Sequence, residues 1–344
     1  MPSASSMPTV SVILLTYNQE AFVAEAVRSW LRQDLADFEL ILSDDASTDR
    51  TREVIDAELA QHPDTSVRVV HCHRPRNGGV LANINAAMAA CSGDIIIAAA
   101  GDDVSEPSRV RLTIEIFAAD PTVQAVVTNC QKIDAEGRPI GAPELRHRTG
   151  RYAYDLEPRD IYARSPVCGA SAAYRASLFR DFGPMQPGSH GEDNCFWVRA
   201  LLRGAVYYDR RPLVLWRQHG ANLSNYSEGG FASAENRQRH LRWMRAHELM
   251  TPQWERDVAL AVERGWVSPE RGALVVDLAR RECARWKLDR CSLEPAPWAE
   301  WKEAARVLLR PGQWSFVYRG FRKWVSRGRR EREWRWWAKV RQQS

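Results

Sequence analysis

The segment LILSDDASTD, residues 40–49, and the segment IIIAAAGDD, residues 95–103, share one design. Each places a pair of aspartates directly after an apolar run that has no polar face. Strands that are apolar on both faces belong to parallel sheets covered by helices, and such sheets bind ligands where their strands end. The sequence therefore predicts that Asp44–Asp45 and Asp102–Asp103 point into one cleft.

The N-terminal hundred residues alternate between strand and helix patterns. Apolar runs typical of strands occur at residues 10–15, 39–43, 67–72 and 95–100. Apolar residues at helical spacing occur at 22–31, 49–60 and 80–90, and Ser47 or a neighbour is expected to cap the second of these helices. This alternation predicts an α/β fold, Rossmann-like, with a mostly parallel central sheet flanked by helices.

The pattern becomes less regular after residue 100. A helix at 107–117, a strand at 125–129 and a hairpin turn at 134–139 are expected, followed by a long loop over the cleft at 141–166. A strand at 170–174, a helix at 191–204 and two closing strands at 206–208 and 213–217 complete the prediction. We expect a catalytic domain at residues 1–228 and a C-terminal helical extension, rich in Trp and Arg, at 229–344.

Composition limits where the protein works. The 344 residues carry a net charge of +5, and the excess of basic residues lies in the tail, at 321–344. No signal peptide is apparent and no apolar run approaches the ~20 residues of a membrane span. We expect a cytoplasmic protein, either free or peripheral on the inner face of the cytoplasmic membrane. The tail, where Trp and Arg alternate, either contacts an anionic membrane surface or packs on the catalytic domain, and nucleic acid is the least favoured partner.

Two adjacent carboxylates after an apolar strand need compensation. Asp102 and Asp103 repel each other unless a cation or hydrogen-bond donors lie beside them, and a divalent metal is the simplest compensation. Hard oxygen ligands in small number suit Mg²⁺ or Mn²⁺ held jointly with substrate phosphates. A capped helix start before Pro107 is the alternative explanation. Similarly, helix capping accounts for one of the acids at 44–49 but not for three.

Four motifs together carry a family resemblance: VSVILLTYN at 10–18, DDASTD at 44–49, NGG at 77–79 and GDDVSEPSR at 101–109. In this order and spacing, they resemble the family 2 glycosyltransferases of GT-A fold over about residues 8–225. The chain departs from the family's commonest patterns at Leu15, where a proline is frequent, and at Ala100, which occupies the position of the first acid in an Asp-x-Asp-Asp run.

The resemblance implies a nucleotide-sugar donor bound mainly by residues 8–130, with an acceptor half at 131–228. Tyr17 would pack on the base, Asp45 or Asp44 would bind its edge, and Asp102 would face the ribose. The metal, Mn²⁺ or Mg²⁺, would be held by Asp103 and His219. The implied donor-binding set is Leu15, Tyr17, Asn18, Glu20, Asp44, Asp45, Arg74, Asn77, Asp102 and Arg217.

Glu192–Asp193 resembles the family's acidic pair at the start of a helix near the acceptor. Inverting transfer needs one carboxylate to take the proton of the attacking hydroxyl, and Asp193 is the candidate base. Glu192 is expected on the acceptor side. The simpler explanation is a pair of helix N-terminal acids that stabilise the macrodipole.

The sequence thus favours an inverting, metal-dependent glycosyltransferase that moves a sugar from a UDP- or dTDP-linked donor to a hydroxyl of a glycan or lipid-linked acceptor, in surface polysaccharide assembly. Two alternatives stay open at this point. One is a metal-dependent nucleotidyl or phosphoryl transferase, although no P-loop or Gly-x-Gly-x-x-Gly fingerprint is present. The other is a non-catalytic binding protein of the same fold.

Overall fold

The computed structural model describes residues 9–142, 149–153, 169–186, 192–220, 222, 234–248, 250–294 and 297–308. These residues form two compact units. The first contains the described residues up to 222 together with Asp257–Ser268, and the second contains the described parts of 234–256 and 269–308.

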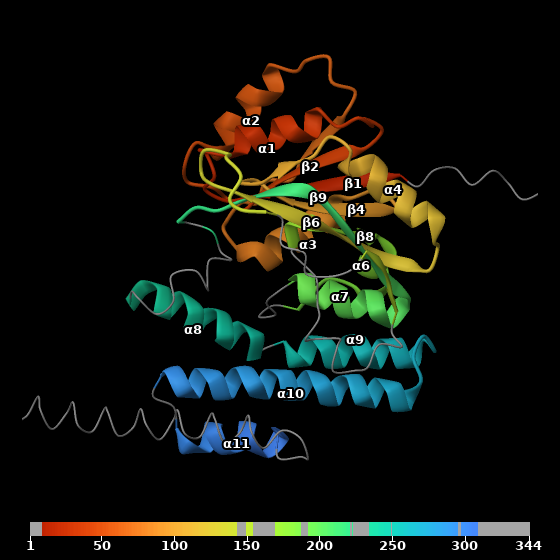
Figure 1. The fold of residues 1–344 in the computed structure, drawn as a ribbon, viewed down its shortest axis with the longest axis vertical. Coiled ribbons are helices and arrows are strands. Elements are labelled where there is room, and N and C mark those ends of the chain that lie inside the picture. Colours follow the sequence, from red (N-terminus) through yellow and green to blue (C-terminus); the bar gives the residue numbers. More distant parts are fainter. Residues whose placement is uncertain are drawn as a thin grey trace, which may run out of the picture. The chain divides into compact units, whose positions relative to one another are not determined.

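A mixed sheet forms the centre of the first unit (Figure 1). Its main path runs in the order β3-β2-β1-β4-β8-β6-β9-β5, and β7 pairs with β9 off this path. The strands β3, β2, β1 and β4 are parallel, whereas β8 is antiparallel to both β4 and β6. The strand bounds are β1 Val10–Thr16, β2 Glu39–Asp44, β3 Arg68–His71, β4 Ile95–Ala100, β5 Val104–Ser105, β6 Val123–Ile133, β7 Gly150–Ala153, β8 Ala172–Arg175 and β9 Ala205–Arg217.

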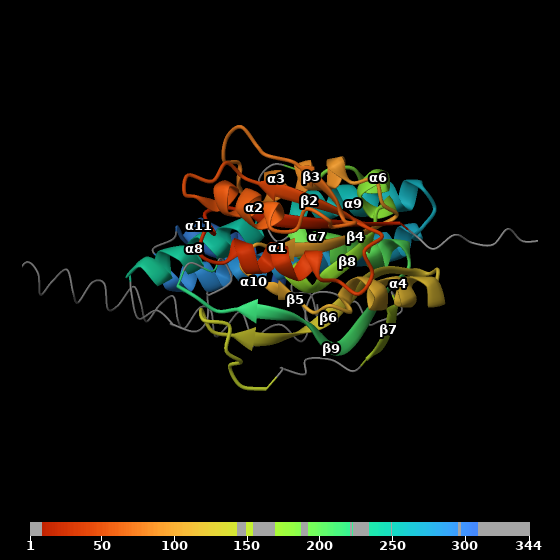
Figure 2. The ribbon, with the colours of Figure 1, turned by 90° about the horizontal axis from the view of Figure 1, so that it is seen from above.

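Helices cover both faces of this sheet. On one face, α1 Val23–Leu31, α2 Thr51–Ala60 and α4 Arg109–Ala119 share a single apolar core with alternate residues of β1, β2 and β4. On the other face lie α3 Gly79–Ala90, α6 Ser177–Phe182 and α7 Glu192–Arg203 (Figures 1 and 2). A short 3₁₀ turn, η1 Gly169–Ser171, leads into β8. The predicted α/β fold with a helix-flanked sheet is confirmed.

Local predictions failed where polar side chains found other partners. Ser47 does not cap α2, because its hydroxyl donates to Asp44 and accepts the Asn18 N–H at 2.9 Å, whereas its neighbour Asp49 accepts the N–H of Thr51, the first residue of the helix, at 3.0 Å. The two expected closing strands are one strand, β9, which pairs along the whole of β6. Within the long loop expected at 141–166, residues 150–153 form the short strand β7, and residues 143–148 and 154–168 lie outside the described residues.

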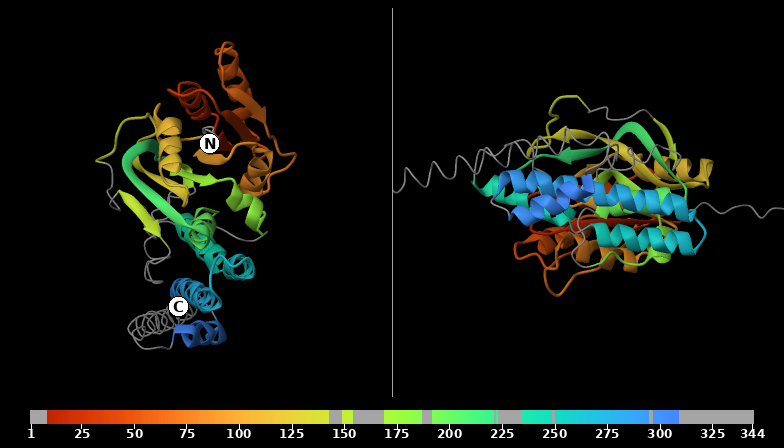
Figure 3. Two further views of the ribbon diagram at one scale, coloured as in Figure 1. Left: turned by 90° about the vertical axis from the view of Figure 1, so that its right-hand side faces the viewer. Right: turned by 90° about the horizontal axis from the view of Figure 1, so that it is seen from below.

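The second unit is helical, as the sequence predicted for the C-terminal extension (Figure 3). Its helices are α8 Ala234–Glu248, α10 Pro269–Leu293 and α11 Trp298–Leu308, with the first half of α9 Thr251–Glu263. Arg290 is the polar centre of this unit and donates to Glu248, Glu294 and Glu300. The expected domain boundary near residue 228 and the basic tail at 321–344 lie outside the described residues, so both stay predictions. None of the described helices is both long and apolar enough to cross a membrane.

Candidate active site

The two aspartate turns meet at one edge of the sheet because β1 lies between β2 and β4. In the parallel register Thr16 pairs with Asp44, and Leu15 pairs with Ala100. Just past these strands, the Asp45 N–H donates to the Thr16 carbonyl at 3.0 Å, and the Gly101 N–H donates to the Leu15 carbonyl at 2.9 Å. The turn after β1 is therefore flanked by an acidic turn on each side, at the carboxyl edge where α/β sheets bind ligands.

Asp44 is fully buried and serves the turn in which it lies. Its carboxylate accepts from the Ser47 N–H at 2.9 Å, from the Thr16 hydroxyl at 3.1 Å and from Arg52 Nε at 2.6 Å. Burial alone would raise the pKa of Asp44, but the hydrogen bonds from Ser47 and the charge of Arg52 outweigh it, so the pKa lies below the ordinary value. Asp44 is thus a satisfied structural anion in this structure.

Asp45 contacts the other residues that were predicted to line the nucleoside pocket. Its carboxylate accepts from the Gly79 N–H at 2.7 Å and from the Gly78 N–H at 3.0 Å, at the start of α3. Arg74 Nε lies 2.8 Å from the same carboxylate, and the Asn77 amide donates to the Asp45 carbonyl at 3.3 Å. Asp45, Arg74 and Asn77 therefore form one polar cluster, as expected for a nucleoside pocket.

The turn after β1 presents one aromatic side chain to solvent. Tyr17 is 45% exposed, which leaves its ring accessible for stacking. Asn18 adopts a left-handed φ of 51° and accepts the Thr48 N–H at 2.8 Å, and Glu20 accepts the Arg50 N–H at 2.9 Å. These two side chains hold the 44–50 loop in place, whereas their contact with a donor stays a prediction, as does that of Leu15.

The second aspartate turn is joined to the end of β9. The Asp102 carboxylate lies 3.0 Å from His219 Nε2, and Asp103 accepts the Arg217 N–H at 2.9 Å. The imidazole of His219 also packs on the Phe22 ring, with the centroids 4.6 Å apart. The structure thus brings together Asp102, Asp103 and His219, the residues predicted to lie around the metal and the ribose.

Arg217 is buried, with only 1% of its surface exposed. Its guanidinium donates to the carbonyls of Asp102 and Ala135, both at 2.9 Å, and to the Glu25 carboxylate, and it lies over the Phe22 ring. These contacts join the aspartate turn, the hairpin after β6 and helix α1. Such a residue shapes the turn, and a contact with the donor phosphates stays a prediction.

Glu192 and Asp193 form the first turn of α7. Within the described part of the chain, the Asp193 carboxylate accepts the neighbouring Asn194 N–H at 2.8 Å and, in contrast to Asp44, forms no ion pair with an arginine. Burial raises the pKa of both carboxyls above their ordinary values, and the repulsion between the pair raises that of Glu192 further. A carboxyl group whose charged form is poorly compensated is suited to accept a proton near neutral pH.

The residues at the second aspartate turn suit a metal ion that is bound jointly with substrate phosphates better than a metal ion bound by protein side chains alone. Among the described residues, no group of three His, Cys, Asp or Glu side chains is placed to hold a metal. The Asp103 carboxylate and the His219 imidazole are nevertheless donor types that Mn²⁺ accepts. Mg²⁺ and Mn²⁺ commonly bind one or two carboxylates and complete their shell with substrate phosphates and water.

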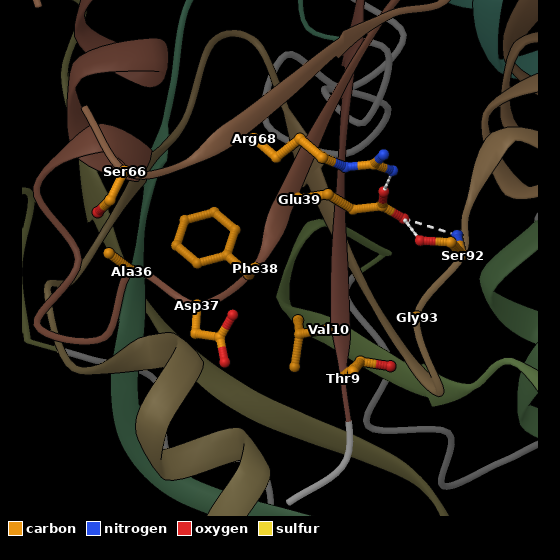
Figure 4. A pocket seen from close by; sticks show the side chains of 10 residues that line it. All are labelled: Thr9, Val10, Ala36, Asp37, Phe38, Glu39, Ser66, Arg68, Ser92 and Gly93. Carbon is orange, nitrogen blue, oxygen red and sulfur yellow. Dashed lines mark hydrogen bonds and ion pairs between the residues drawn. The ribbon is translucent and has the colours of Figure 1, made fainter. Parts of the chain in front are cut away.

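A cavity of about 400 Å³ lies at the opposite, amino edge of the parallel strands (Figure 4). Glu39 lies in its wall and accepts from the Ser11 hydroxyl at 2.5 Å, the Ser92 N–H at 2.6 Å and Arg68. Although burial opposes it, these hydrogen bonds lower the pKa of Glu39 to about 2. A carboxylate so fully compensated is poorly suited to accept a proton, so Glu39 is not a candidate general base.

Sequence reasoning missed the residues that support the site. Arg52, Glu25 and Phe22 each contact a predicted site residue: Arg52 binds Asp44, which is near it in the sequence, whereas the partners of Glu25 and Phe22 are far away in the sequence. One local feature does draw attention to Glu25: it is an acidic residue in the first turn of α1, the helix that follows β1. Nothing in the sequence pairs it with Arg217.

The parallel strands and the turns that meet at their carboxyl edge place the first unit in the α/β class, whose ligands bind at that edge. Residues 11–183 match the family model described as glycosyl transferase family 2, and the chain belongs to this family. It is a glycosyltransferase, as the sequence motifs indicated.

Individual relatives and solved structures agree with this assignment. An uncharacterized glycosyltransferase of Nostoc sp. (strain PCC 7120) is 26% identical over 233 residues, which cover 66% of this chain and 69% of that protein. Chondroitin synthase of Escherichia coli is 33% identical over 162 residues, 47% of this chain but 22% of that protein.

Two solved structures share the fold. S. aureus TarS 1–349 in complex with UDP-GlcNAc has a TM-score of 0.55 at 16% identity and covers 93% of this chain, with 92% of TarS 1–349 covered in return. The mannosyltransferase PcManGT of Pyrobaculum calidifontis, in complex with GDP-Man and Mn²⁺, has a TM-score of 0.50 at 18% identity, with 93% and 86% covered. At these identities the likeness supports the GT-A fold.

Proposed function

We propose that this glycosyltransferase is inverting and metal-dependent, and that it transfers a sugar from a UDP- or dTDP-linked donor to a hydroxyl of a glycan or lipid-linked acceptor. The observation that carries the proposal is the meeting of the two aspartate turns on either side of the β1 turn. One turn offers Asp45, Arg74 and Asn77 to a nucleoside, and the other offers carboxylates at the position of the diphosphate.

Each residue then has a distinct task. Tyr17 stacks on the base, and Asp102 and Asp103 face the ribose and the metal together with His219. When bound, Mn²⁺ or Mg²⁺ offsets the negative charge that develops on the departing diphosphate. Asp193 accepts the proton of the acceptor hydroxyl, while Glu192 orients the acceptor. Arg217 fixes the aspartate turn through its contacts with the Asp102 carbonyl and Glu25.

The raised pKa of Asp193 supports its assignment as the base. A carboxylate that is hydrogen-bonded like Asp44 would hold its negative charge too firmly to accept a proton. The proposed setting, surface polysaccharide assembly at the inner face of the cytoplasmic membrane, draws on the similarity to chondroitin synthase. The basic tail would then supply membrane contact.

A thermal-shift screen tests the donor. UDP-, dTDP- and GDP-linked sugars are added separately, each with and without Mn²⁺, to the full chain. A ligand present at a hundred times its Kd stabilises the folded state by about 2.7 kcal/mol, so a true donor gives a clear rise in Tm. We expect UDP or dTDP compounds to act, and to act more strongly with Mn²⁺. A shift with GDP-sugars alone, or with none, contradicts the donor assignment.

A further inference from the structure

The turn η1 lies directly against the acidic pair of α7. A methyl group built on Gly169 would lie 3.1 Å from Glu192 Oε1, 3.7 Å from Asp193 Cβ and 4.0 Å from Asp193 Oδ2. The contact with the Glu192 oxygen would be tight, whereas those with Asp193 would be ordinary van der Waals contacts. The backbone of η1 therefore forms one wall beside Glu192 and Asp193, whose side chains are partly buried.

The same turn is held by a buried arginine from the other side. Arg109, 1% exposed, donates from Nη2 to the Ala170 carbonyl at 2.7 Å and to the Ala98 carbonyl at 2.8 Å. Its Nη1 donates to the Ser105 hydroxyl at 3.0 Å, and the guanidinium lies 5.2 Å from the centre of the Trp30 ring. Arg109 thus connects η1 to β4, the strand that ends in the Asp102–Asp103 turn.

We propose that Arg109 is a positioning residue for the Glu192–Asp193 pair and acts through η1, where Gly169 is kept against both carboxylates. The inference rests on the proposed role of Asp193 as the base. It extends that role by naming the group that fixes the position of the base relative to the donor-binding residues. This group is the Arg109 guanidinium, which binds the backbone of both β4 and η1.

The proposal has a consequence for protonation. Burial is the main cause of the raised pKa of both carboxyls, so any change that admits water between η1 and α7 lowers it. Several charged groups on α7 and on the elements near it form ion pairs, and Arg175 of β8 binds backbone carbonyls instead. These pairs are Asp181 with Arg203, Asp257 with Arg199, Asp209 with Arg211, and Arg217 with Glu25.

Two substitutions at η1 and its support are expected to change the access of water to Asp193 in opposite directions. Arg109→Lys keeps the charge, but its side chain is one bond shorter and ends in a single nitrogen, so it cannot reach the Ala98 and Ala170 carbonyls while also binding the Ser105 hydroxyl. We expect η1 to loosen, water to enter and the pKa of Asp193 to fall. Gly169→Ala adds a methyl group against both carboxylates, which excludes more water and raises the pKa. The two variants are therefore expected to shift Asp193 titration by about one pH unit in opposite directions, a tenfold change in proton affinity each.

Arg175→Lys is the matched control. Arg175 also donates to two backbone carbonyls, those of Val123 at 2.8 Å and Phe117 at 3.0 Å, and its guanidinium lies over the Phe117 ring. It lies at the far end of β8, where it pairs with Ile95 at the start of β4. Arg175→Lys should lower stability to a similar degree as Arg109→Lys without moving the titration of Asp193.

The experiment is a ¹³C-carboxyl NMR titration of the full chain labelled in Asp and Glu, with the Asp193 signal assigned by its loss in Asp193→Asn. Opposite shifts in Arg109→Lys and Gly169→Ala, with none in Arg175→Lys, support the proposal. An unchanged titration in Gly169→Ala overturns it, even where Arg109→Lys fails to fold, and so does an equal shift in Arg175→Lys.

Turnover separates this inference from the proposed function. The rate of nucleoside diphosphate release is measured with the UDP- or dTDP-sugar that gives the largest thermal shift. In Arg109→Lys we expect a lower kcat with an unchanged donor KM, because the base rather than the donor pocket moves. If Asp193→Asn turns over at the wild-type rate, the base assignment fails. If it is inactive while Gly169→Ala titrates like wild type, only the positioning role fails.

Discussion

Asp44 and Asp193 are acids in crowded surroundings of the same unit, and their surroundings act on them in opposite ways. Asp44 receives the Ser47 N–H, two hydroxyls and Arg52, and its pKa is lowered. Asp193 accepts the neighbouring Asn194 N–H, and the burial of its partly exposed side chain raises its pKa. Asp44, fully buried and bound on all sides, is part of the scaffold, whereas the charged form of Asp193 is disfavoured by its surroundings, which suits it to accept a proton.

The largest effect that tests this contrast is on catalysis. Asp193→Asn should lower kcat by about 10²- to 10⁴-fold, the usual contribution of a general base, with little change in donor KM. Asp181→Asn is the control, because Asp181 lies on α6 and pairs with Arg203 of α7 at 3.1 Å, without contact to the proposed base. Release of nucleoside diphosphate measures both. A wild-type rate in Asp193→Asn would contradict the proposed difference in role between Asp193 and Asp44.

A smaller loss is expected at the metal. Asp103→Asn keeps an oxygen that can accept the Arg217 N–H, so the turn should persist while one negative ligand is lost. We expect the Mn²⁺ concentration needed for half-maximal UDP binding to rise by about tenfold to a hundredfold. Calorimetric titration of UDP at a series of Mn²⁺ concentrations measures it. Identical Mn²⁺ dependence in variant and wild type would place the metal elsewhere.

Asp44→Asn should act on folding instead. The variant loses a charged acceptor for Arg52 and places an amide where the Ser47 N–H and hydroxyl need an acceptor. Hydrogen bonds to charged groups contribute about 2 kcal/mol each, so the free energy of unfolding should fall by at least that amount. Urea unfolding followed by circular dichroism measures the change. A variant as stable as wild type would mean that the 44–50 loop is not held by this carboxylate.

The smallest effect is a difference in the pH dependence of stability. Asp193, with a pKa raised above 3.8, binds its proton more tightly in the folded state, so ionisation destabilises the fold as pH rises through that window. Asp44, with a pKa lowered below 3.8, contributes stability that is lost as pH falls through its folded pKa. The stability of Asp193→Asn relative to wild type should therefore grow from about pH 4 to about pH 7, while that of Asp44→Asn should be worst at neutral pH. Equal slopes in thermal melts across this range would contradict both assignments.

The ligand edge of the sheet could be predicted from the sequence because its signals are local. Apolar runs that end in Asp44–Asp45 and Asp102–Asp103 specify parallel strands and the turns that follow them, and the structure places those turns side by side. The glycines at 78 and 79 likewise mark a turn, and their N–H groups bind Asp45.

The supporting arginines could not be predicted, because their partners are distant in sequence. Arg217 and Glu25 are 192 residues apart, and Arg109 and Ala170 are 61 apart. An arginine is usually a surface residue, and nothing in its neighbours announces that its guanidinium will be covered and bound to backbone carbonyls. Burial of this kind emerges only when the sheet and helices have assembled.

The irregular pairing of β9 with β6 has a consequence for how this enzyme can change. Between Ala205 and Arg217 the strand β9 has two more residues than β6 has between Val123 and Ile133, because irregularities between Asp209 and Val214 add three residues to β9 and one between Val123 and Ala125 adds one to β6. Side chains alternate along a strand, so the loss of one residue there would turn Arg217 and everything after it to the opposite face, while the loss of two would draw it back by about 7 Å. The length of β9 therefore determines where Arg217 lies in the proposed sugar-transfer site. We expect insertions and deletions among homologues of this chain to fall outside β9.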